Sequence, residues 1–325
     1  KFRYSPVSSR SSVSMVRPIC VLIALSTTLV TATDPCGATR CDTAACACGC
    51  ECGTPDDQGL CYTPKTLLST EPCAIEHHTP AITRTVPVTG ATGRTGSLIY
   101  KRMVAAGHDT RAFVRSADKA RKVLGCSLCD ESEGIYLGNV SSVTQLERAT
   151  LGTSIVAIAV GVSGFGPQNV TKAVEFVGVQ NTVAALAQPS NIASYGVDGL
   201  RVLFVSSMGT TLPAPPKEAG GPILFWKLNA EAFISASGLS FAIVKPGGLL
   251  MTAGDNSTLL VGKDDALFKV NPPVVSRDDV ARVVVASLEF PYSVRLDLVS
   301  QPGPPTTDVN ALLKEALYPW QQGAH

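Results

Sequence analysis

The sequence predicts an α/β protein built on a doubly wound parallel sheet with helices on both faces. Two observations support this fold class. From about residue 85 onward short β-branched runs alternate with longer helical segments, and a glycine-rich turn links the first strand to the first helix. Hydrophobic residues make up 45% of the 325 residues, which is enough to bury a sizeable core. No internal repeat is found.

The first elements form one strand–helix–strand unit. The β-branched run at 85–89 predicts a strand, and the apolar spacing at 95–106 predicts a helix that the following glycine ends. A second run predicts a strand at 109–114, and a serine in the N-cap position opens a helix at 116–124. The glycine-rich turn therefore lies between a strand and a helix.

The later elements follow the same two rules. Short β-branched runs predict strands at 134–137, 154–160, 201–206, 241–244 and 295–299. Apolar spacing of three to four residues predicts helices at 170–187, 221–235, 276–289 and 308–317. The segment at about 249–275 carries no motif, and we expect it to form a small C-terminal lobe that covers the site and selects the substrate.

The residues before 85 differ in composition and divide into two segments. In 1–33, MVRPICVLIALSTTLVTAT from Met15 predicts a secretory signal peptide, with an apolar anchor or an overextended gene model as alternatives. Its apolar run is too short for a convincing membrane span. The segment 34–84 contains eight of the 11 cysteines. Three interpretations of it stay open: a disulfide-linked or disordered leader, a processed targeting segment, or a metal-binding module.

The stretch VTGATGRTG at 88–96 is the most informative motif of the remaining domain, 85–325. Gly90 permits a tight turn, Gly93 lets the backbone approach a pyrophosphate, and Gly96 lets the helix pack on the strand. The helix N-terminus presents N–H groups and a partial positive charge to the anion. A strand before the motif and a helix after it favour dinucleotide binding over a turn without a ligand.

The GxxGxxG spacing resembles the extended and atypical branches of the short-chain dehydrogenase/reductase superfamily, and TGATGRTG resembles the NmrA-like NAD(P)-binding group. The resemblance extends over most of residues 85–290. EFVGVQNTVAAL, FVSSMG, WKLNAEAFISASGLSFAIVKPGGL and SRDDVA are similar to segments of the family in the same order. The resemblance implies a Rossmann-type fold that binds a nicotinamide dinucleotide.

The resemblance also implies which residues bind the cofactor. Asn139 is expected beside the adenine, Gly161 under the adenosine ribose, and Lys227 on the nicotinamide ribose. The segment Pro246-Gly247-Gly248 is expected close to the nicotinamide, where the absence of side chains gives room. The full expected set is Gly90, Thr92, Gly93, Arg94, Thr95, Gly96, Arg115, Asn139, Val140, Gly161, Ser206, Lys227, Pro246, Gly247 and Gly248.

The end of the second strand favours NADP(H) over NAD(H). NAD-binding proteins usually place Asp or Glu there to accept a hydrogen bond from the ribose 2′-OH, whereas residues 113–116 read FVRS. A guanidinium suits a 2′-phosphate, so Arg115 is its expected partner and Arg94 could flank the same phosphate. The alternative is that Arg115 is a solvated charge that pairs with Asp118.

The Tyr-x-x-x-Lys pair of ordinary short-chain reductases is incomplete. None of the seven tyrosines is followed four residues later by Lys, and Ile223 occupies the tyrosine position that matches Lys227. The phenol that would donate a proton is therefore missing. Ser207 and Lys227 remain as catalytic candidates, with Ser206 or Ser207 orienting a substrate carbonyl. In the alternative, both serines only form hydrogen bonds to backbone.

Other motifs add little. The 27 basic and 26 acidic side chains nearly balance, which argues against a nucleic-acid partner. No histidine triad and no metal site are expected in the domain. Cys126 and Cys129 predict a local disulfide or surface thiols, in preference to a redox switch.

Three functions remain open at this stage. The first is an NADPH-dependent oxidoreductase that reduces a flavin, quinone or conjugated carbonyl without the Tyr–Lys proton relay. The second is a non-catalytic NADP(H) sensor or assembly protein, which implies a protein partner. In the third, the Cys-rich segment is the functional module. The expected location is a plastid, which the protein would enter through the signal-peptide route. The alternative is that the protein is secreted.

Overall fold

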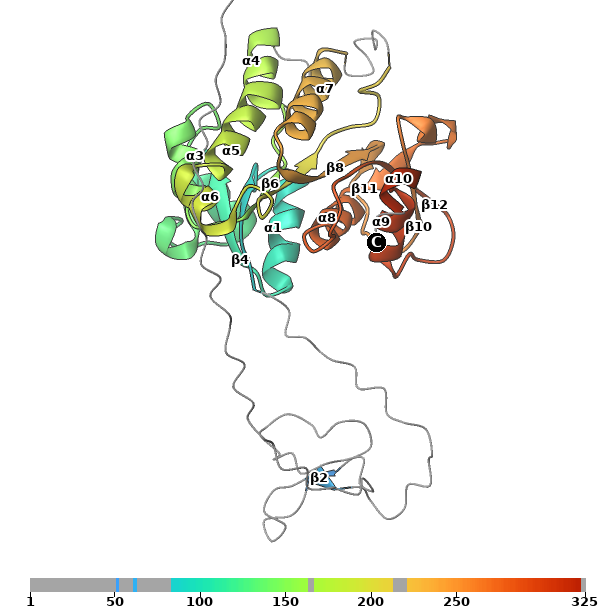
Figure 1. Cartoon of the computed structure of the whole chain (residues 1–325), viewed down its shortest axis with the longest axis horizontal. Coiled ribbons are helices and arrows are strands. Elements are labelled where there is room, and N and C mark those ends of the chain that lie inside the picture. Colours follow the sequence, from blue (N-terminus) through green and yellow to red (C-terminus); the bar gives the residue numbers. More distant parts are fainter. Residues whose placement is uncertain (1–50, 53–60, 63–82, 163–166, 213–220, 323–325) are drawn as a thin grey trace, which may run out of the picture. The chain divides into compact units, whose positions relative to one another are not determined.

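The structure is a computed structural model that describes residues 51–52, 61–62, 83–162, 167–212 and 221–322 (Figure 1). The chain divides into two units, Lys1–His78 and Thr79–His325. In the first unit, β1 (Glu51–Cys52) pairs antiparallel with β2 (Cys61–Tyr62). The expected signal peptide and most of the Cys-rich segment lie outside the described residues.

The second unit is built around an eight-stranded sheet with the order β10-β12-β8-β7-β6-β3-β4-β5. Neighbouring strands are parallel except at β10, which is antiparallel to β12. The strand order reverses at β3, which has β4 on one side and β6 on the other, so a crevice opens beyond the carboxyl ends of β3 and β6. The strands are β3 (Thr85–Thr89), β4 (Asp109–Val114), β5 (Ile135–Leu137), β6 (Ile155–Ile158), β7 (Arg201–Val205), β8 (Ser240–Pro246), β10 (Thr258–Gly262) and β12 (Val294–Gln301).

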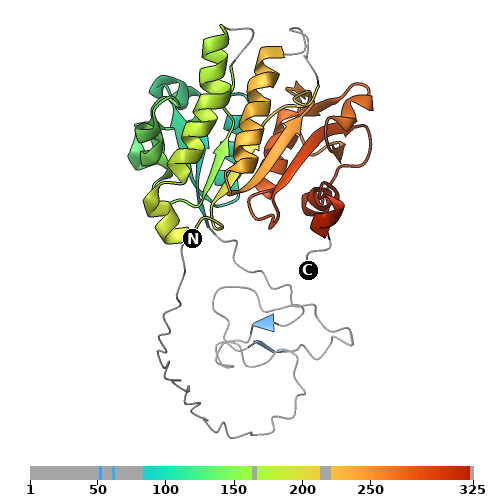
Figure 2. The same cartoon turned by 45° about the horizontal axis from the view of Figure 1, so that its top comes forward.

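Helices cover both faces of this sheet, and each face has its own apolar core. The first core includes Ile99, Ala120, Val283 and Leu312, from α1 (Gly96–Ala105), α2 (Ala117–Leu124), α8 (Arg277–Ala286) and α9 (Val309–Glu315). The second core is formed by α3 (Val143–Thr150), α5 (Gly178–Leu186) and α7 (Gly221–Ala236). In Figure 2 the yellow-green α5 and the orange α7 lie in front of the sheet. The doubly wound fold class is therefore confirmed.

Every predicted strand and helix is present with small shifts at its ends, but one helix is interrupted. The predicted helix 170–187 consists of α4 (Gln168–Lys172), a π-helical turn (Ala173–Val177) and α5. Three short helices were not predicted: α3, α6 (Pro189–Tyr195) and α10 (Pro319–Gln322). Segments this short give only a weak helical period, although α2 and α9, which are about as short, were predicted.

The lobe after β8 contains more strand than the sequence indicated. A short strand β9 (Gly248–Leu250) pairs in parallel with β11 (Val274–Ser276), and β10 extends the main sheet. A Cβ at Gly247 would lie 2.2 Å from the Pro273 carbonyl oxygen, so the approach of these two segments requires glycine there. We expected the missing side chain at Gly247 to leave space for a nicotinamide. The Pro273 backbone of the lobe also needs that space.

A buried cluster of charges ties the lobe to the sheet. The Lys245 Nζ lies 2.8 Å from the Asp265 carboxylate and 3.2 Å from that of Asp297, and all three side chains are buried. Asp265 also accepts hydrogen bonds from the N–H groups of Gly209 and Thr211, in the loop after β7. The cluster therefore fixes the segment before η5 (Ala266–Lys269) against that loop.

No helix in the parts of the chain that the structure describes is long and apolar enough to span a bilayer.

Candidate functional site

The glycine turn has the geometry that its sequence predicts. Gly90 has a left-handed φ of +76°, and a Cβ there would lie 2.5 Å from the Ala159 carbonyl oxygen at the end of β6. A Cβ at Gly96 would lie 2.2 Å from the Gly90 carbonyl oxygen. The Gly93 N–H donates to that same oxygen at 2.8 Å and closes the turn. The first and third glycines thus serve the tight turn and the close packing that were predicted for them.

The N-terminus of α1 is suited to an anion. Its N-cap residue Thr95 makes no side-chain hydrogen bond to the helix, whereas Ser116 caps α2 with its hydroxyl. The N–H groups at the start of a helix attract phosphate when no side chain caps them. In α1 those of Ser97 and Leu98 also donate to the carbonyls of Gly93 and Thr95, both at 3.0 Å. The turn and helix therefore provide the expected place for a pyrophosphate.

Two adjoining cavities lie along the carboxyl ends of the strands. We call the first, of about 620 Å³, the Arg115 cavity, and the second, of about 610 Å³, the Lys227 cavity. Thr92, Gly93 and Gly161 line both, so the glycine turn lies where the cavities meet. Together they form one cleft at the crevice that the topology predicts.

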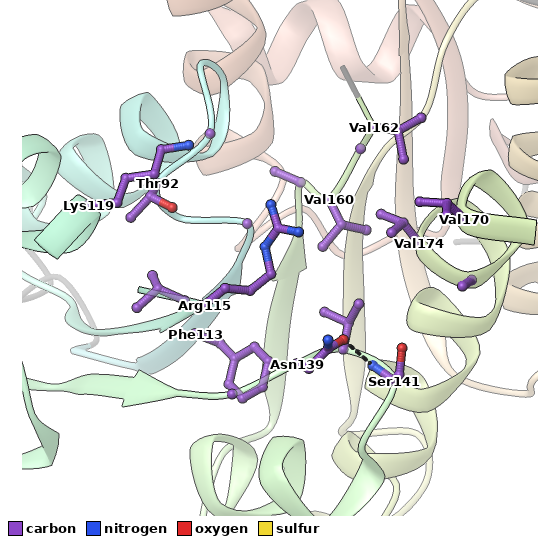
Figure 3. Close-up of a pocket in the computed structure, with 18 of the residues that line it drawn as sticks. Thr92, Phe113, Arg115, Lys119, Asn139, Ser141, Val160, Val162, Val170 and Val174 are labelled. Atoms are coloured by element: carbon purple, nitrogen blue, oxygen red, sulfur yellow. Dashed lines mark hydrogen bonds between the residues drawn. The ribbon is translucent and has the colours of Figure 1, made fainter. Parts of the chain in front are cut away.

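The Arg115 cavity contains the residues predicted around the adenosine half of the cofactor. Asn139 and Val140 line it, and the Asn139 Oδ1 accepts the Ser141 N–H at 3.0 Å. Asn181 Nδ2 in α5 donates to the Val140 carbonyl at 2.9 Å and holds this loop in place. In Figure 3 Val160, Val162, Val170 and Val174 form an apolar wall on the side opposite Thr92 and Lys119.

Arg115 is exposed, and its guanidinium extends into the space between Thr92 and Val160 (Figure 3). The alternative pairing with Asp118 is not found, because Asp118 pairs with Arg121 at 3.1 Å instead. Arg94 does not line this cavity but the Lys227 cavity. The second cation near Arg115 is Lys119, which lines both. Lys119 is in the first turn of α2. Its position just after the second strand of the predicted unit was the sequence signal that could have identified it as a site residue.

The Lys227 cavity contains the predicted catalytic candidates. Lys227 is 8% exposed; its Nζ lies 3.1 Å from Glu175 Oε2 and donates to the Val205 carbonyl at 3.2 Å. Glu175 is 1% exposed and comes from the π-helical turn before α5, and its Oε1 accepts the Val162 N–H at 2.8 Å. A buried lysine and a buried carboxylate thus neutralise each other in the wall of the cavity.

Both serines already have hydrogen-bond partners. Ser206 is buried and donates to Glu231, and the carboxylate of Glu231 is also paired with Arg295. The Ser207 hydroxyl donates to the Met208 carbonyl at 2.9 Å and is half-buried. Ser207 and Ile223 line the same cavity as Lys227, so the tyrosine position predicted from the sequence does face the cleft. An aliphatic side chain occupies it.

The remaining predicted residues are distributed as follows. Arg94, Thr95, Ser206, Pro246 and Gly247 line the Lys227 cavity. Gly96 and Gly248 line neither cavity, and they serve packing instead. At Gly248 the backbone N–H donates to the Pro273 carbonyl at 2.8 Å.

Besides Lys119, two charged residues of the Lys227 cavity were not predicted as site residues. Glu175 was noted only for its place in the family-like helix, and Arg277 only within SRDDVA. Arg277 is the first residue of α8 and is 7% exposed. Neither could be placed from the sequence, because the cleft is formed by elements about a hundred residues apart.

Cys126 and Cys129 form a disulfide after α2, which is one of the two states that the sequence predicted for them. Neither cysteine lines the cleft.

The residues of the cleft fit a dinucleotide. The turn is closed to any Cβ at Gly90 and Gly96, the α1 N-terminus has no side-chain cap, and cationic side chains lie on both sides of it. A doubly wound sheet with this turn at its crevice defines a Rossmann-type dinucleotide-binding protein.

Comparison with known proteins assigns the family. The model of a family described as NAD(P)H-binding matches residues 90–291, well over half of the chain. The chain therefore belongs to this NAD(P)H-binding family, and its similarity to atypical short-chain dehydrogenases/reductases is confirmed. A nicotinamide dinucleotide is the ligand of this fold.

Several relatives come from plants. An uncharacterized chloroplastic protein of Arabidopsis thaliana is 30% identical over 71% of this chain and 75% of its own length. Sanguinarine reductase of Eschscholzia californica is 29% identical over 73% of this chain and 97% of its own. The chloroplastic protein TIC 62 of Arabidopsis thaliana is 26% identical over 70% of this chain but only 37% of its own length.

A solved structure shows the same fold. A Bacillus halodurans protein described as an NAD-dependent epimerase/dehydratase superposes with a TM-score of 0.57 at 20% identity. The match covers 71% of this chain and 99% of that one.

Proposed function

We propose that the protein is an NADP(H)-dependent oxidoreductase that transfers a hydride to a small, easily reduced acceptor such as a flavin, a quinone or a conjugated carbonyl. The observation that carries the proposal is the cleft itself: a dinucleotide turn and a second cavity lined by Ser207, Ile223 and Lys227. A relative, sanguinarine reductase, is named for a reduction, which supports this reaction class.

The choice of NADP(H) rests on the Arg115 cavity. Arg115 and Lys119 line it, and the described part of its lining contains no carboxylate. A carboxylate would accept from a ribose 2′-OH and repel a 2′-phosphate, whereas two cations favour the phosphate. These charges support NADP(H) over NAD(H).

The residues of the Lys227 cavity have separate parts in the reaction. When bound, the nicotinamide supplies the hydride. Lys227, held by Glu175, would place a positive charge at the nicotinamide ribose, and Ser207 would orient the polar group of the acceptor. Ile223 has no proton to donate, so the proton must come from solvent. An acceptor that is easily reduced needs no strong acid in the hydride-transfer step, which is why we favour flavins and quinones.

The test is turnover of NADPH by the full chain with a panel of quinones and flavins. We expect oxidation of NADPH with at least one acceptor, and slower oxidation of NADH. The variant Ile223→Tyr restores the phenol opposite Lys227 and should raise activity toward carbonyl acceptors more than toward quinones. Tight NADPH binding without turnover across the panel would contradict the reductase.

The second candidate is a non-catalytic NADP(H) sensor or assembly protein. The observation that favours it is that Lys227 and Ser206 are bonded to buried carboxylates and Ile223 replaces the acid. Binding without turnover is its expected outcome, and a protein partner would then read the bound state.

The plastid is the proposed location. Relatives with related sequences carry chloroplastic names, and NADPH is abundant in that compartment. Fluorescent tagging at the C-terminus would distinguish plastid import from secretion.

A further inference from the structure

The charges that line the Lys227 cavity do not balance. Lys227 and Glu175 pair with each other at 3.1 Å. The other charged residues of the described lining are Arg94, Lys119 and Arg277, all of them cationic. Among the residues that the structure describes, Glu175 is the one carboxylate in this lining, and it is already paired, so the described lining has an excess of positive charge.

Arg277 differs from the other two cations because its side chain is largely buried, whereas Arg94 and Lys119 are exposed. It is 7% exposed, and its Nη1 donates to the Leu249 carbonyl at 3.0 Å. This bond fixes the guanidinium beside β9, and the remaining N–H groups have no carboxylate partner among the described residues. None of these free N–H groups is a fully buried atom without a partner, and Arg277 lines the cavity, so an anion that enters it would meet a fixed guanidinium with unused donors.

The two acids that follow Arg277 in the chain do not neutralise it. Asp278 is bonded to Arg102 of α1 at 2.7 Å, and Asp279 is paired with Arg282 at 3.0 Å. Both carboxylates also accept backbone N–H groups, from Gly254 and Asp255 respectively. Both acids therefore already have other partners.

A second guanidinium faces the same place. Arg94 lies in the glycine turn before α1, and α1 packs against α8, so Arg94 and Arg277 lie at the N-terminal ends of two adjacent helices. Burial lowers the pKa of Arg277, and the nearby charge of Arg94 lowers it further. Arginine stays charged nevertheless, because its pKa lies far above neutral pH.

We propose that Arg277 and Arg94 form an anion subsite in the Lys227 cavity that binds a carboxylate or phosphate group of the acceptor. This inference rests on the proposed function and narrows it to acceptors that carry a negative charge. Two guanidiniums can form several parallel charge-assisted hydrogen bonds to such a group.

The position of Arg277 favours the acceptor over the cofactor pyrophosphate as the source of the anion. Arg277 lies in the lobe side of the cleft with Leu249 and Met251, and it does not line the Arg115 cavity. It follows directly on β11, which pairs with β9. Leu249, Met251 and Ile223 provide apolar surface beside it, which suits a planar ring that bears an anionic group.

The experiment compares two flavins that differ by one phosphate. FMN carries it and riboflavin does not, and both are measured with the full chain and NADPH. We expect Arg277→Gln to lower kcat/KM for FMN by about tenfold or more. Activity with riboflavin and the Kd for NADPH should change by less than about twofold. Arg94→Gln should also lower kcat/KM for FMN more than for riboflavin, and its Kd for NADPH is no criterion because Arg94 belongs to the glycine turn. Arg277→Lys should restore part of the loss with FMN.

Arg148→Gln is the matched control, since Arg148 is exposed on α3 and lines neither cavity. Equal losses for FMN and riboflavin would overturn the proposal. A rise of about tenfold in the Kd for NADPH would also overturn it, because Arg277 would then bind the pyrophosphate.

A binding measurement separates this inference from the proposed reductase. If the wild-type chain turns over no acceptor of the panel, the reductase fails. Whenever neither flavin is turned over, flavin binding to the NADP⁺-loaded protein is measured by fluorescence quenching. Tighter binding of FMN than of riboflavin that Arg277→Gln abolishes would support the subsite. Equal affinity of the wild type for both would refute it.

Discussion

Single glycines decide whether the nucleotide turn can form, and the chain offers an internal comparison. Gly90 and Gly107 both have left-handed φ values, +76° and +82°. A Cβ at Gly90 would collide with the Ala159 backbone, whereas a Cβ at Gly107 would meet nothing within 4 Å. The same backbone strain is therefore present at both positions, and only Gly90 adds a steric conflict.

We predict that Gly90→Ala lowers the free energy of unfolding by about 3 kcal/mol or more, because overpacking adds to the strain of a left-handed alanine. Gly107→Ala should cost only about 1 kcal/mol, the strain alone. Urea unfolding of the two variants measures the difference. Equal losses would show that the contact with Ala159 relaxes freely.

Arg115 is the residue on which the choice of cofactor depends. We predict that Arg115→Glu raises the Kd for NADPH by at least about tenfold and the Kd for NADH by much less, because a carboxylate repels the 2′-phosphate and accepts from a 2′-OH. Titration of both nucleotides by fluorescence measures this.

Lys122→Glu is its charge-matched control, since Lys122 is exposed on α2 and lines neither cavity. If Arg115→Glu weakened NADPH and NADH equally, the 2′-phosphate would have no role in recognition.

The sequence predicted residues of the site unequally. Gly90, Gly96, Arg115 and Lys227 could be identified because each belongs to a local pattern whose chemistry is known. Arg277 could not, because its importance lies in what its neighbours do: Asp278 and Asp279 look like its partners in sequence, yet they bond to Arg102 and Arg282. Only the folded structure shows that these two acids are bonded to other arginines.

The packing of α1 on α8 depends in part on one ion pair. Arg102 Nε donates to Asp278 Oδ1 at 2.7 Å, and both side chains are mostly buried. The hydrogen bond from Arg102 holds the pKa of Asp278 below its ordinary range. An acid with a lowered folded-state pKa stabilises the fold above its unfolded pKa, which is about 3.9. That stability is lost as the pH falls through the folded-state pKa.

We predict that Asp278→Asn lowers the free energy of unfolding at neutral pH by about 1 kcal/mol. The difference from wild type should shrink below about pH 4 and vanish once Asp278 is protonated. Urea unfolding from neutral pH to about pH 3 follows this. The exposed Asp118→Asn is the control and should have almost no effect. A difference that persists unchanged in acid would exclude the ion pair as its cause.

At the scale of elements, the sequence predicted the helices and strands that have a sustained apolar pattern or a clear N-cap. It failed where tertiary pairing makes the element, as in β9 and β11, which are three residues each and are strands only because they pair. It also missed the π-helical turn, because the apolar spacing of 170–187 continues through it. That turn is where Glu175 is positioned to meet Lys227.

At the scale of the whole molecule, the cleft belongs to one unit. All residues that line the two cavities lie between Gly90 and Arg277, within Thr79–His325. We predict that residues 79–325 expressed alone bind NADPH with the same Kd as the full chain, within about twofold. Fluorescence titration of both proteins measures it, and metal analysis of residues 34–84 tests the remaining interpretation of the Cys-rich segment. A large loss of affinity would show that the first unit contributes to the site.

The position of β12 has a consequence for synthesis of the protein. It is the last strand of the part of the chain that the structure describes, yet it lies inside the sheet, between β8 and the antiparallel β10. Until the ribosome has released residues 294–301, the edge of β8 has no neighbour on that side and β10 has no sheet to join. Unpaired strand edges favour aggregation. The nascent chain therefore stays vulnerable until residues 294–301 have been made, and a product truncated shortly before Val294 should depend on chaperones to remain in solution.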